Sequence, residues 1–111
     1  MNPAGEPQEV PAAQVPAQAY LLDVREDDEW RAGHAPEAKH IPLGVLGERA
    51  SQVPRDQDVY VICKSGRRSA RATEALSSGG WQAINVADGM LGWESAGRAM
   101  TSESGEPPFV A

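Results

Sequence analysis

One thiol stands in a sequence context that favours the chemistry of an ionised sulfur. Cys63 is the only cysteine of the 111-residue chain, and it follows the apolar run 59–62 and precedes a helical pattern. Six residues follow it in the intervening loop: Lys64, Ser65, Gly66, Arg67, Arg68 and Ser69. A strand, a tight loop and a helix start in this order aim backbone N–H groups and the positive helix end at one point. The segment therefore predicts a site for an anionic sulfur or oxyanion, with Cys63 as the reactive group.

The distribution of charge supports such a site. The chain carries 10 Lys and Arg against 16 Asp and Glu, with a formal net charge of -6, which argues against binding of nucleic acid or an anionic membrane. Four of the cations nevertheless fall within eight residues: Lys64, Arg67, Arg68 and Arg71. Cations usually favour the C-terminal end of a helix rather than its start. We therefore expect a local anion site on an otherwise acidic protein.

Composition also limits the other chemistry that we expect. A single cysteine allows neither an internal disulfide nor a cysteine-rich metal site, and we expect no metal or cofactor. His34 and His40 lack partners at metal-ligand spacing, so we expect them to form turn-stabilising hydrogen bonds. The sequence has no apolar stretch that could span a bilayer and no secretory pattern at its start, so we expect a cytoplasmic location.

The elements that must position Cys63 alternate along the chain. Residues 1–18 are rich in proline and predict an arm or loose first element, residues 19–100 predict the folded domain, and residues 101–111 predict a flexible tail. We expect strands at 19–24, 39–41, 58–62 and 83–86, and helices at 26–30, 45–50, 67–78 and 93–99. Alternation of this kind predicts an α/β fold, in which a small parallel sheet has helices on both faces. Ligands bind such sheets at the carboxyl ends of the strands, where Cys63 lies.

Four motifs occur in an order that resembles one family. Residues 22–25 (Leu-Asp-Val-Arg), residues 33–42 (Gly-His-Ala-Pro-Glu-Ala-Lys-His-Ile-Pro), the C-x-x-G-x-R-S loop and residues 89–93 (Gly-Met-Leu-Gly-Trp) are similar to motifs of single-domain rhodanese-like proteins, the thiosulfate sulfurtransferase family. The resemblance covers roughly residues 19–97. Ala35, Glu37 and Asp88 depart from the family pattern, at positions that concern packing and turn shape.

The resemblance implies a sulfurtransferase whose cysteine cycles between thiolate and persulfide. Cys63 would be the nucleophile, the backbone of 64–69 would stabilise the anion, and Arg67 and Arg68 would help to recruit the donor. The implied donor is thiosulfate or a persulfide, and the implied acceptor is cyanide, a thiol or a protein. Asp23 and Arg25, at the end of a strand, are expected to form a structural ion pair that supports the loop.

Two other interpretations remain open at this stage. A cysteine phosphatase or arsenate reductase also binds an oxyanion in a Cys-to-Arg loop, although that motif resembles C-x5-R and only four residues separate Cys63 from Arg68. Asp88 is the candidate acid for that chemistry. The third interpretation is a non-catalytic interaction module, whose acidic surface would meet a basic protein partner. Trp93 is expected to be a core aromatic that shapes the mouth of the pocket.

Overall fold

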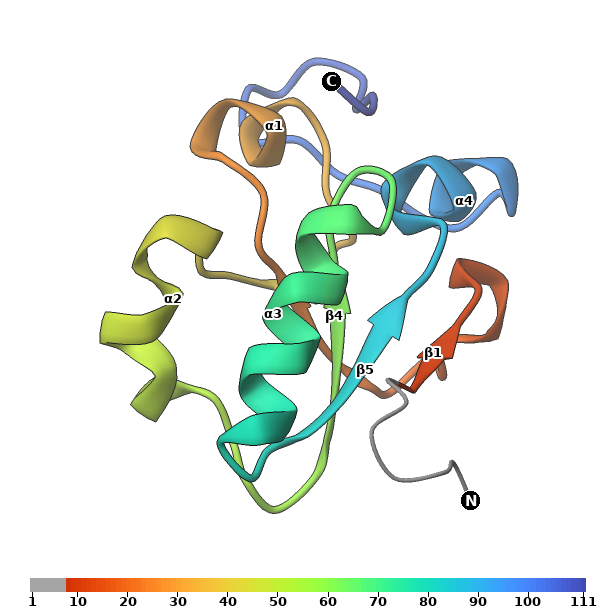
Figure 1. The fold of residues 1–111 in the computed structure, drawn as a ribbon. Coiled ribbons are helices and arrows are strands. Elements are labelled where there is room, and N and C mark those ends of the chain that lie inside the picture. The colour runs from red at the N-terminus through yellow and green to blue at the C-terminus, as the bar shows by residue number, and fades with distance from the viewer. Residues whose placement is uncertain (1–7) are drawn as a thin grey trace.

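A parallel sheet organises the part of the chain that the computed structural model describes, residues 8–111 (Figure 1). Its five strands, in the spatial order β1-β5-β4-β2-β3, all pair in parallel. The strands are β1 (Glu9–Val10), β2 (Tyr20–Asp23), β3 (Lys39–His40), β4 (Asp58–Ile62) and β5 (Gln82–Val86). The α/β fold class predicted from the alternation of elements is confirmed.

The helices fall between the strands, as the sequence predicts. They are α1 (Asp27–Ala32), α2 (Leu43–Arg49), α3 (Arg67–Ser78) and α4 (Gly89–Ser95), with short 3-10 turns η1 (Ala12–Gln14) and η2 (Ala50–Gln52). The predicted bounds of β4 and α3 match the structure. The predicted last helix, 93–99, is wrong: α4 begins four residues earlier and ends before Gly97, which adopts a φ of 70°.

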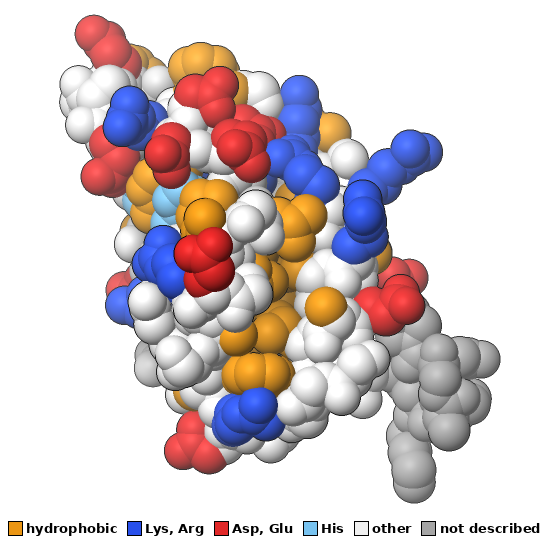
Figure 2. Space-filling view, turned by 60° about the vertical axis from the view of Figure 1, so that its left-hand side comes forward, with side chains coloured by type: hydrophobic (Ala, Val, Ile, Leu, Met, Phe, Trp, Pro, Cys, Tyr) orange, Lys and Arg blue, Asp and Glu red, His pale blue; other side chains and the backbone are white. Residues whose placement is uncertain are grey.

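The strands bury both of their faces, because alternate side chains point to opposite sides of the sheet. In β4, Val59 and Val61 belong to the core under α2 and α3, whereas Ile62 belongs to the core under η1 and α4. Hydrophobic side chains also gather in a furrow between α2 and α3, which Figure 2 shows as a band across the molecule. Both faces of the sheet are thus covered, as the fold class requires.

The strand order places the point where the chain changes direction between β4 and β2. From β4 the chain passes through α3 to β5 on one side, whereas from β2 it passes through α1 to β3 on the other. Connections that leave neighbouring strands in opposite directions separate at the carboxyl ends of those strands. The segment after β4, which contains Cys63, therefore faces the segment after β2, which leads into α1.

Both ends of the described chain pair with the folded domain through backbone hydrogen bonds. Strand β1, within the predicted arm 1–18, pairs with β5, and residues 1–7 of that arm lie outside the described residues. The segment predicted to be a flexible tail lies along α1 (Figure 1), where Thr101 pairs with His34 through two backbone hydrogen bonds and Phe109 N donates to Ala32 O. Within residues 8–111, no helix is both long and apolar enough to cross a membrane.

Candidate active site

The loop after β4 surrounds the sulfur of Cys63 with hydrogen-bond donors. The backbone N–H groups of Gly66 and Ser69 donate to Sγ at 3.2 and 3.3 Å, and the Ser69 hydroxyl donates at 3.2 Å. Two of these donors belong to the first turn of α3, where the N–H groups have no partner within the helix. The sulfur therefore occupies the anion site that the strand, loop and helix order predicts.

Three carbonyl groups of the same loop accept hydrogen bonds from the segment β5–α4. Met90 N donates to Cys63 O at 2.8 Å, and Leu91 N donates to Lys64 O at 3.1 Å. The side-chain amide of Asn85, a buried residue of β5, donates to the carbonyl of Gly66 at 3.2 Å. Because the carbonyls are fixed on one side, the amides of this loop are left to face Sγ on the other.

Glycine is required at two positions where this loop meets its support. Gly66 has a φ of 96°, a left-handed conformation that residues with a side chain rarely adopt. A Cβ atom there would also collide with the carbonyl oxygen of Ala87. Gly89, with a φ of 58°, approaches the backbone of Lys64 so closely that a Cβ atom would collide with its carbonyl oxygen. The two glycines allow the loop and the start of α4 to pack backbone to backbone.

The environment of Cys63 lowers the pKa of its thiol below the ordinary value. Burial is the largest single influence and raises the pKa, since only 1% of Cys63 is exposed. The hydrogen bonds from the Ser69 hydroxyl and from the amides of Ser69, Gly66 and Ser65 act in the opposite direction and together outweigh burial. These hydrogen bonds are the largest of the influences that lower the thiol pKa. The thiolate is thus favoured by oriented dipoles of the loop.

The predicted cations of the loop differ in their surroundings. Arg68 donates from Nη1 and Nη2 to the two carboxylate oxygens of Glu29 in α1, at 2.7 and 2.8 Å. This pair lowers the pKa of Glu29 to about 2 and raises that of Arg68. Arg67 is exposed, and Lys64 is half-buried. Arg68, which is expected to help recruit the donor, is therefore already bound to a carboxylate.

Asp23 and Arg25 form the ion pair that the sequence analysis expects at the end of β2. Arg25 donates from Nη2 to Asp23 Oδ2 at 2.8 Å, and Nε donates to both oxygens of the same carboxylate. Both side chains are fully buried, and Arg25 Nη2 also donates to Gly33 O at 2.8 Å. The pair thus links β2 to the end of α1, the helix that carries Glu29.

The two histidines pack around Trp30. Its ring stacks on that of His34 at a centroid distance of 3.5 Å and on that of His40 at 4.7 Å. His34 Nδ1 lies 2.9 Å from the carbonyl oxygen of Ala35, and His40 Nε2 lies 2.7 Å from that of Arg25. One ring nitrogen of each histidine therefore forms a hydrogen bond with a backbone carbonyl group of a turn. Among the residues that the structure describes, no three His, Cys, Asp or Glu side chains gather where they could hold a metal ion.

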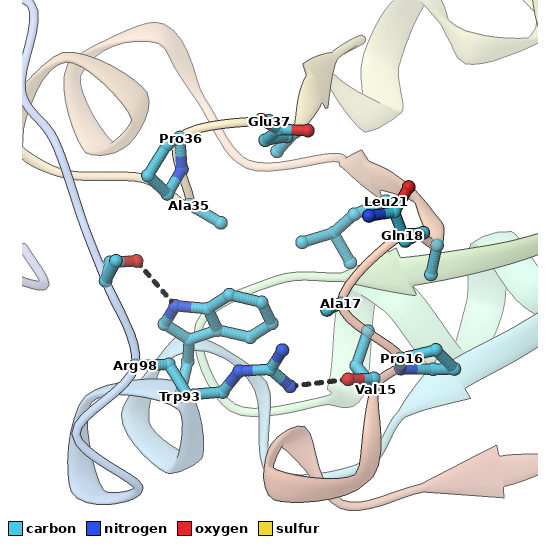
Figure 3. A pocket seen from close by; sticks show the side chains of 13 residues that line it. Val15, Pro16, Ala17, Gln18, Leu21, Ala35, Pro36, Glu37, Trp93 and Arg98 are labelled. Atoms are coloured by element: carbon cyan, nitrogen blue, oxygen red, sulfur yellow. Dashed lines mark hydrogen bonds between the residues drawn. The ribbon is translucent and has the colours of Figure 1, made fainter.

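Trp93 lies away from the loop that holds the sulfur. Its ring lines a cavity of about 330 Å³ between η1, the turn at 35–38 and the end of α4, and Figure 3 shows its Nε1 donating to Ala99 O at 2.9 Å. None of residues 63–69 lines this cavity. Asp88, the candidate acid of the phosphatase interpretation, accepts the amide of Ala12 at 2.7 Å.

Two residues that the sequence analysis did not single out contribute to the site. Glu29 binds Arg68, and Asn85 holds the loop carbonyl of Gly66. Asn85 could be recognised from the sequence, because it is the one polar residue of the run Ala83-Ile84-Asn85-Val86. A buried polar side chain in an apolar strand needs a hydrogen-bond partner, and here that partner is the loop. Nothing in the sequence distinguishes Glu29 from its acidic neighbours.

Comparisons with known proteins agree with this geometry. The sequence profile of the family described as "Rhodanese-like domain" matches residues 6–96. YtwF of Bacillus subtilis is 40% identical over 75 residues, which are 68% of this chain and 73% of that protein. A sulfurtransferase of Allochromatium vinosum is 31% identical over 86 residues, which are 77% of this chain and 80% of that protein.

Solved structures show the same fold. A rhodanese-related protein from Thermoplasma volcanium superposes with a TM-score of 0.80 at 32% identity, and the match covers 85% of this chain and 97% of that chain. The motifs around Cys63, the profile that spans most of the chain and the shared fold lead to one conclusion. The chain belongs to the rhodanese-like domain family.

Proposed function

We propose that the protein is a sulfurtransferase in which Cys63 is the nucleophile and carries sulfane sulfur as a persulfide. The observation that carries the proposal is the set of three donors from Gly66 and Ser69 around Sγ. A ring of donors around a single sulfur favours its anionic form, which is the form that attacks. The family and the sulfurtransferase relative support the same chemistry.

The reaction consists of two displacements at sulfur. In the first, the Cys63 thiolate attacks the sulfane sulfur of a donor, the S–S bond of the donor breaks, and the leaving group departs with the electron pair. Thiosulfate releases sulfite, and a hydropersulfide releases a thiol after its proton passes to the departing sulfur. Cys63 then carries one additional sulfur atom, which is anionic.

In the second displacement, a thiophilic acceptor attacks that outer sulfur. Cyanide would leave as thiocyanate, and an acceptor thiolate would leave as a persulfide, while the electron pair of the broken S–S bond returns to Sγ. The loop donors serve both stages, because the thiolate and the persulfide are both anions. The 111 residues hold no second cysteine, which supports transfer to a separate acceptor molecule.

The test is to load the protein and weigh it. Purified protein is mixed with thiosulfate and, separately, with an excess of a small hydropersulfide, and its intact mass is measured under non-reducing conditions. We expect a gain of one sulfur atom that is lost again on addition of cyanide. The Cys63→Ser variant should keep the circular dichroism spectrum of the wild type and gain no sulfur. Wild-type protein that gains no sulfur from either donor would refute the proposal and would favour a non-catalytic module.

A further inference from the structure

The ion pair between Glu29 and Arg68 connects α1 to the helix that follows the Cys63 loop. Glu29 belongs to α1, on the β2 side, and Arg68 to the first turn of α3, on the β4 side. The two hydrogen bonds, at 2.7 and 2.8 Å, join both guanidinium Nη atoms to both carboxylate oxygens. A two-pronged contact of this kind fixes the guanidinium in position as well as neutralising it. The side chains are 34% exposed for Arg68 and 15% for Glu29, so solvent screens the pair only in part.

Arg68 is close to the reacting sulfur. It precedes Ser69, whose amide and hydroxyl both donate to Sγ. The negative charge of Cys63 is among the causes that raise the pKa of Arg68, after the contact with Glu29. Arg68 is therefore a cation within electrostatic reach of the thiolate, and its charge is compensated by Glu29.

The other charged residues of α1, the Cys63 loop and the start of α3 do not give this region a net positive charge. Four acidic residues stand at the start of α1: Glu26, Asp27, Asp28 and Glu29. Four cations stand on the facing loop and the start of α3: Lys64, Arg67, Arg68 and Arg71. Arg25 is paired with Asp23 inside the fold. Figure 2 shows acidic and basic side chains intermingled at the end of the molecule where α1 lies. The formal charges of these two groups balance, so a dianion gains no net attraction from them.

We propose that Glu29 is a specificity-determining residue, which by neutralising Arg68 makes Cys63 select hydropersulfides over thiosulfate. Thiosulfate brings two negative charges to an anionic sulfur, whereas a hydropersulfide brings one or none at its sulfane end. The step is the first displacement described above: the Cys63 thiolate and R–S–SH give the Cys63 persulfide anion and R–SH. The selection rests on the proposed sulfurtransferase function and concerns which donor feeds it.

The experiment compares two donors of different charge in single-turnover loading. Thiosulfate and 2-hydroxyethyl hydropersulfide are each mixed with the protein, the reaction is quenched by alkylation, and the gain of one sulfur is followed by intact mass. The measured quantity is the ratio of the thiosulfate rate constant to the hydropersulfide rate constant. The variants are Glu29→Gln, which leaves Arg68 charged and uncompensated, and Arg68→Gln, which leaves Glu29 alone. Glu74→Gln, on the exposed side of α3, is the matched control for the change of one charge.

We expect Glu29→Gln to raise the ratio about tenfold at low salt, because a freed cation near the thiolate acts more strongly on a dianion than on a donor with one negative charge or none. Arg68→Gln should lower the ratio below that of the wild type. The double variant should return it close to the wild-type value, and Glu74→Gln should leave it unchanged. Added salt should reduce the effect of Glu29→Gln, since an exposed charge is screened.

Two results would overturn the inference while leaving the sulfurtransferase function in place. One is a ratio in Glu29→Gln that stays within twofold of the wild type although Cys63 still loads. The other is a change that is equal for both donors, which would mean that the pair only holds the loop in shape. Should Glu29→Gln fail to fold, Arg68→Gln and the salt dependence of the wild-type ratio decide alone. Loading from neither donor in the wild type would instead refute the proposed function, and the selection with it.

Discussion

Replacing Ser69 by alanine tests whether hydrogen bonds keep the Cys63 sulfur ionised. The substitution removes the hydroxyl that donates to Sγ at 3.2 Å and leaves the amide donors of Gly66 and Ser69 in place. Ser69 is fully buried, and the hydroxyl that is lost is itself the donor, so the change leaves no new unpaired group on the helix. Its effect should therefore fall on the thiolate.

The size of the effect follows from one lost bond to a charged acceptor. Such a bond contributes about 1.5–3 kcal/mol, which corresponds to a roughly 10- to 150-fold smaller ionisation constant of the thiol. The pKa of Cys63 should therefore rise in the variant. A less acidic thiol is also a better nucleophile once ionised, with a Brønsted coefficient of about 0.4–0.5. At pH values below both thiol pKa values, the loading rate should then fall only about 4- to 20-fold.

The assay is the rate of Cys63 alkylation by iodoacetamide as a function of pH, together with the ultraviolet absorbance of the thiolate. The profile of Ser69→Ala should be displaced to higher pH, and its rate at alkaline pH should equal or exceed that of the wild type. Ser78→Ala, at the exposed end of the same helix, is the control. An unchanged profile, or a rate that is reduced equally at every pH, would refute the account of thiol activation by loop hydrogen bonds.

Three further predictions concern the parts that hold the site together. Ala at Gly66 should cost at least about 1–2 kcal/mol of stability in urea unfolding, more than Ala at Gly97, which has open space around it; equal costs would contradict the close packing of the loop. Asp23→Ala should cost about 3–5 kcal/mol in the same assay, because it leaves the buried Arg25 without a partner, and a loss below about 1 kcal/mol would argue against a structural pair. The pKa of Glu29 is lowered from 4.5 to about 2, so the stability that its ion pair contributes is present above pH 4.5 and lost as the pH falls through 2. The difference in unfolding free energy between wild type and Glu29→Gln should be below about 1 kcal/mol near neutral pH and should shrink over that acid range, whereas a difference that grows would reverse the sign.

The sequence was sufficient to predict β4, the loop and α3. The run Val59–Ile62 is apolar throughout, as a strand with two covered faces must be, and glycines stand at both ends of the helix that follows. These sequence features are local, and the donors of the loop between β4 and α3 lie close to Cys63 in the sequence. The contact of Gly66 and Ser69 with the sulfur spans only three and six residues. Short-range geometry of this kind can be inferred without knowledge of the remaining fold.

The partners supplied by other segments could not be inferred in this way. Glu29 lies 39 residues before Arg68, and their contact depends on which side of β4 the chain takes after β2. Asn85 reaches Gly66 across 19 residues because β5 returns beside β4. The sequence analysis therefore assigned Arg68 to the donor, whereas the fold supplies it with a carboxylate. The pattern of charges in a sequence does not reveal which opposite charges the topology brings together.

The start of α4 was misplaced for a related reason. The sequence predicts a helix that starts near Trp93, after Gly89 and Gly92, and glycine has a low intrinsic helix propensity. In the structure, the N–H groups of Met90 and Leu91 donate to the carbonyls of Cys63 and Lys64. Position 89 requires glycine because the two backbones touch there. The glycine therefore reflects a tertiary contact, which overrides the low intrinsic helix propensity.

The segment that lies along α1 bears on how this fold can be cut and joined. The family profile ends at residue 96, yet backbone hydrogen bonds from Thr101 and Phe109 reach His34 and Ala32. Phe109 can pass over residue 33 only because that residue is glycine, since a Cβ atom would lie 2.5 Å from the Phe109 carbonyl oxygen. A fusion that replaces the chain from residue 97 onward would remove these backbone hydrogen bonds from the end of α1, the helix that carries Glu29. A fusion joined after Val110 would keep these hydrogen bonds.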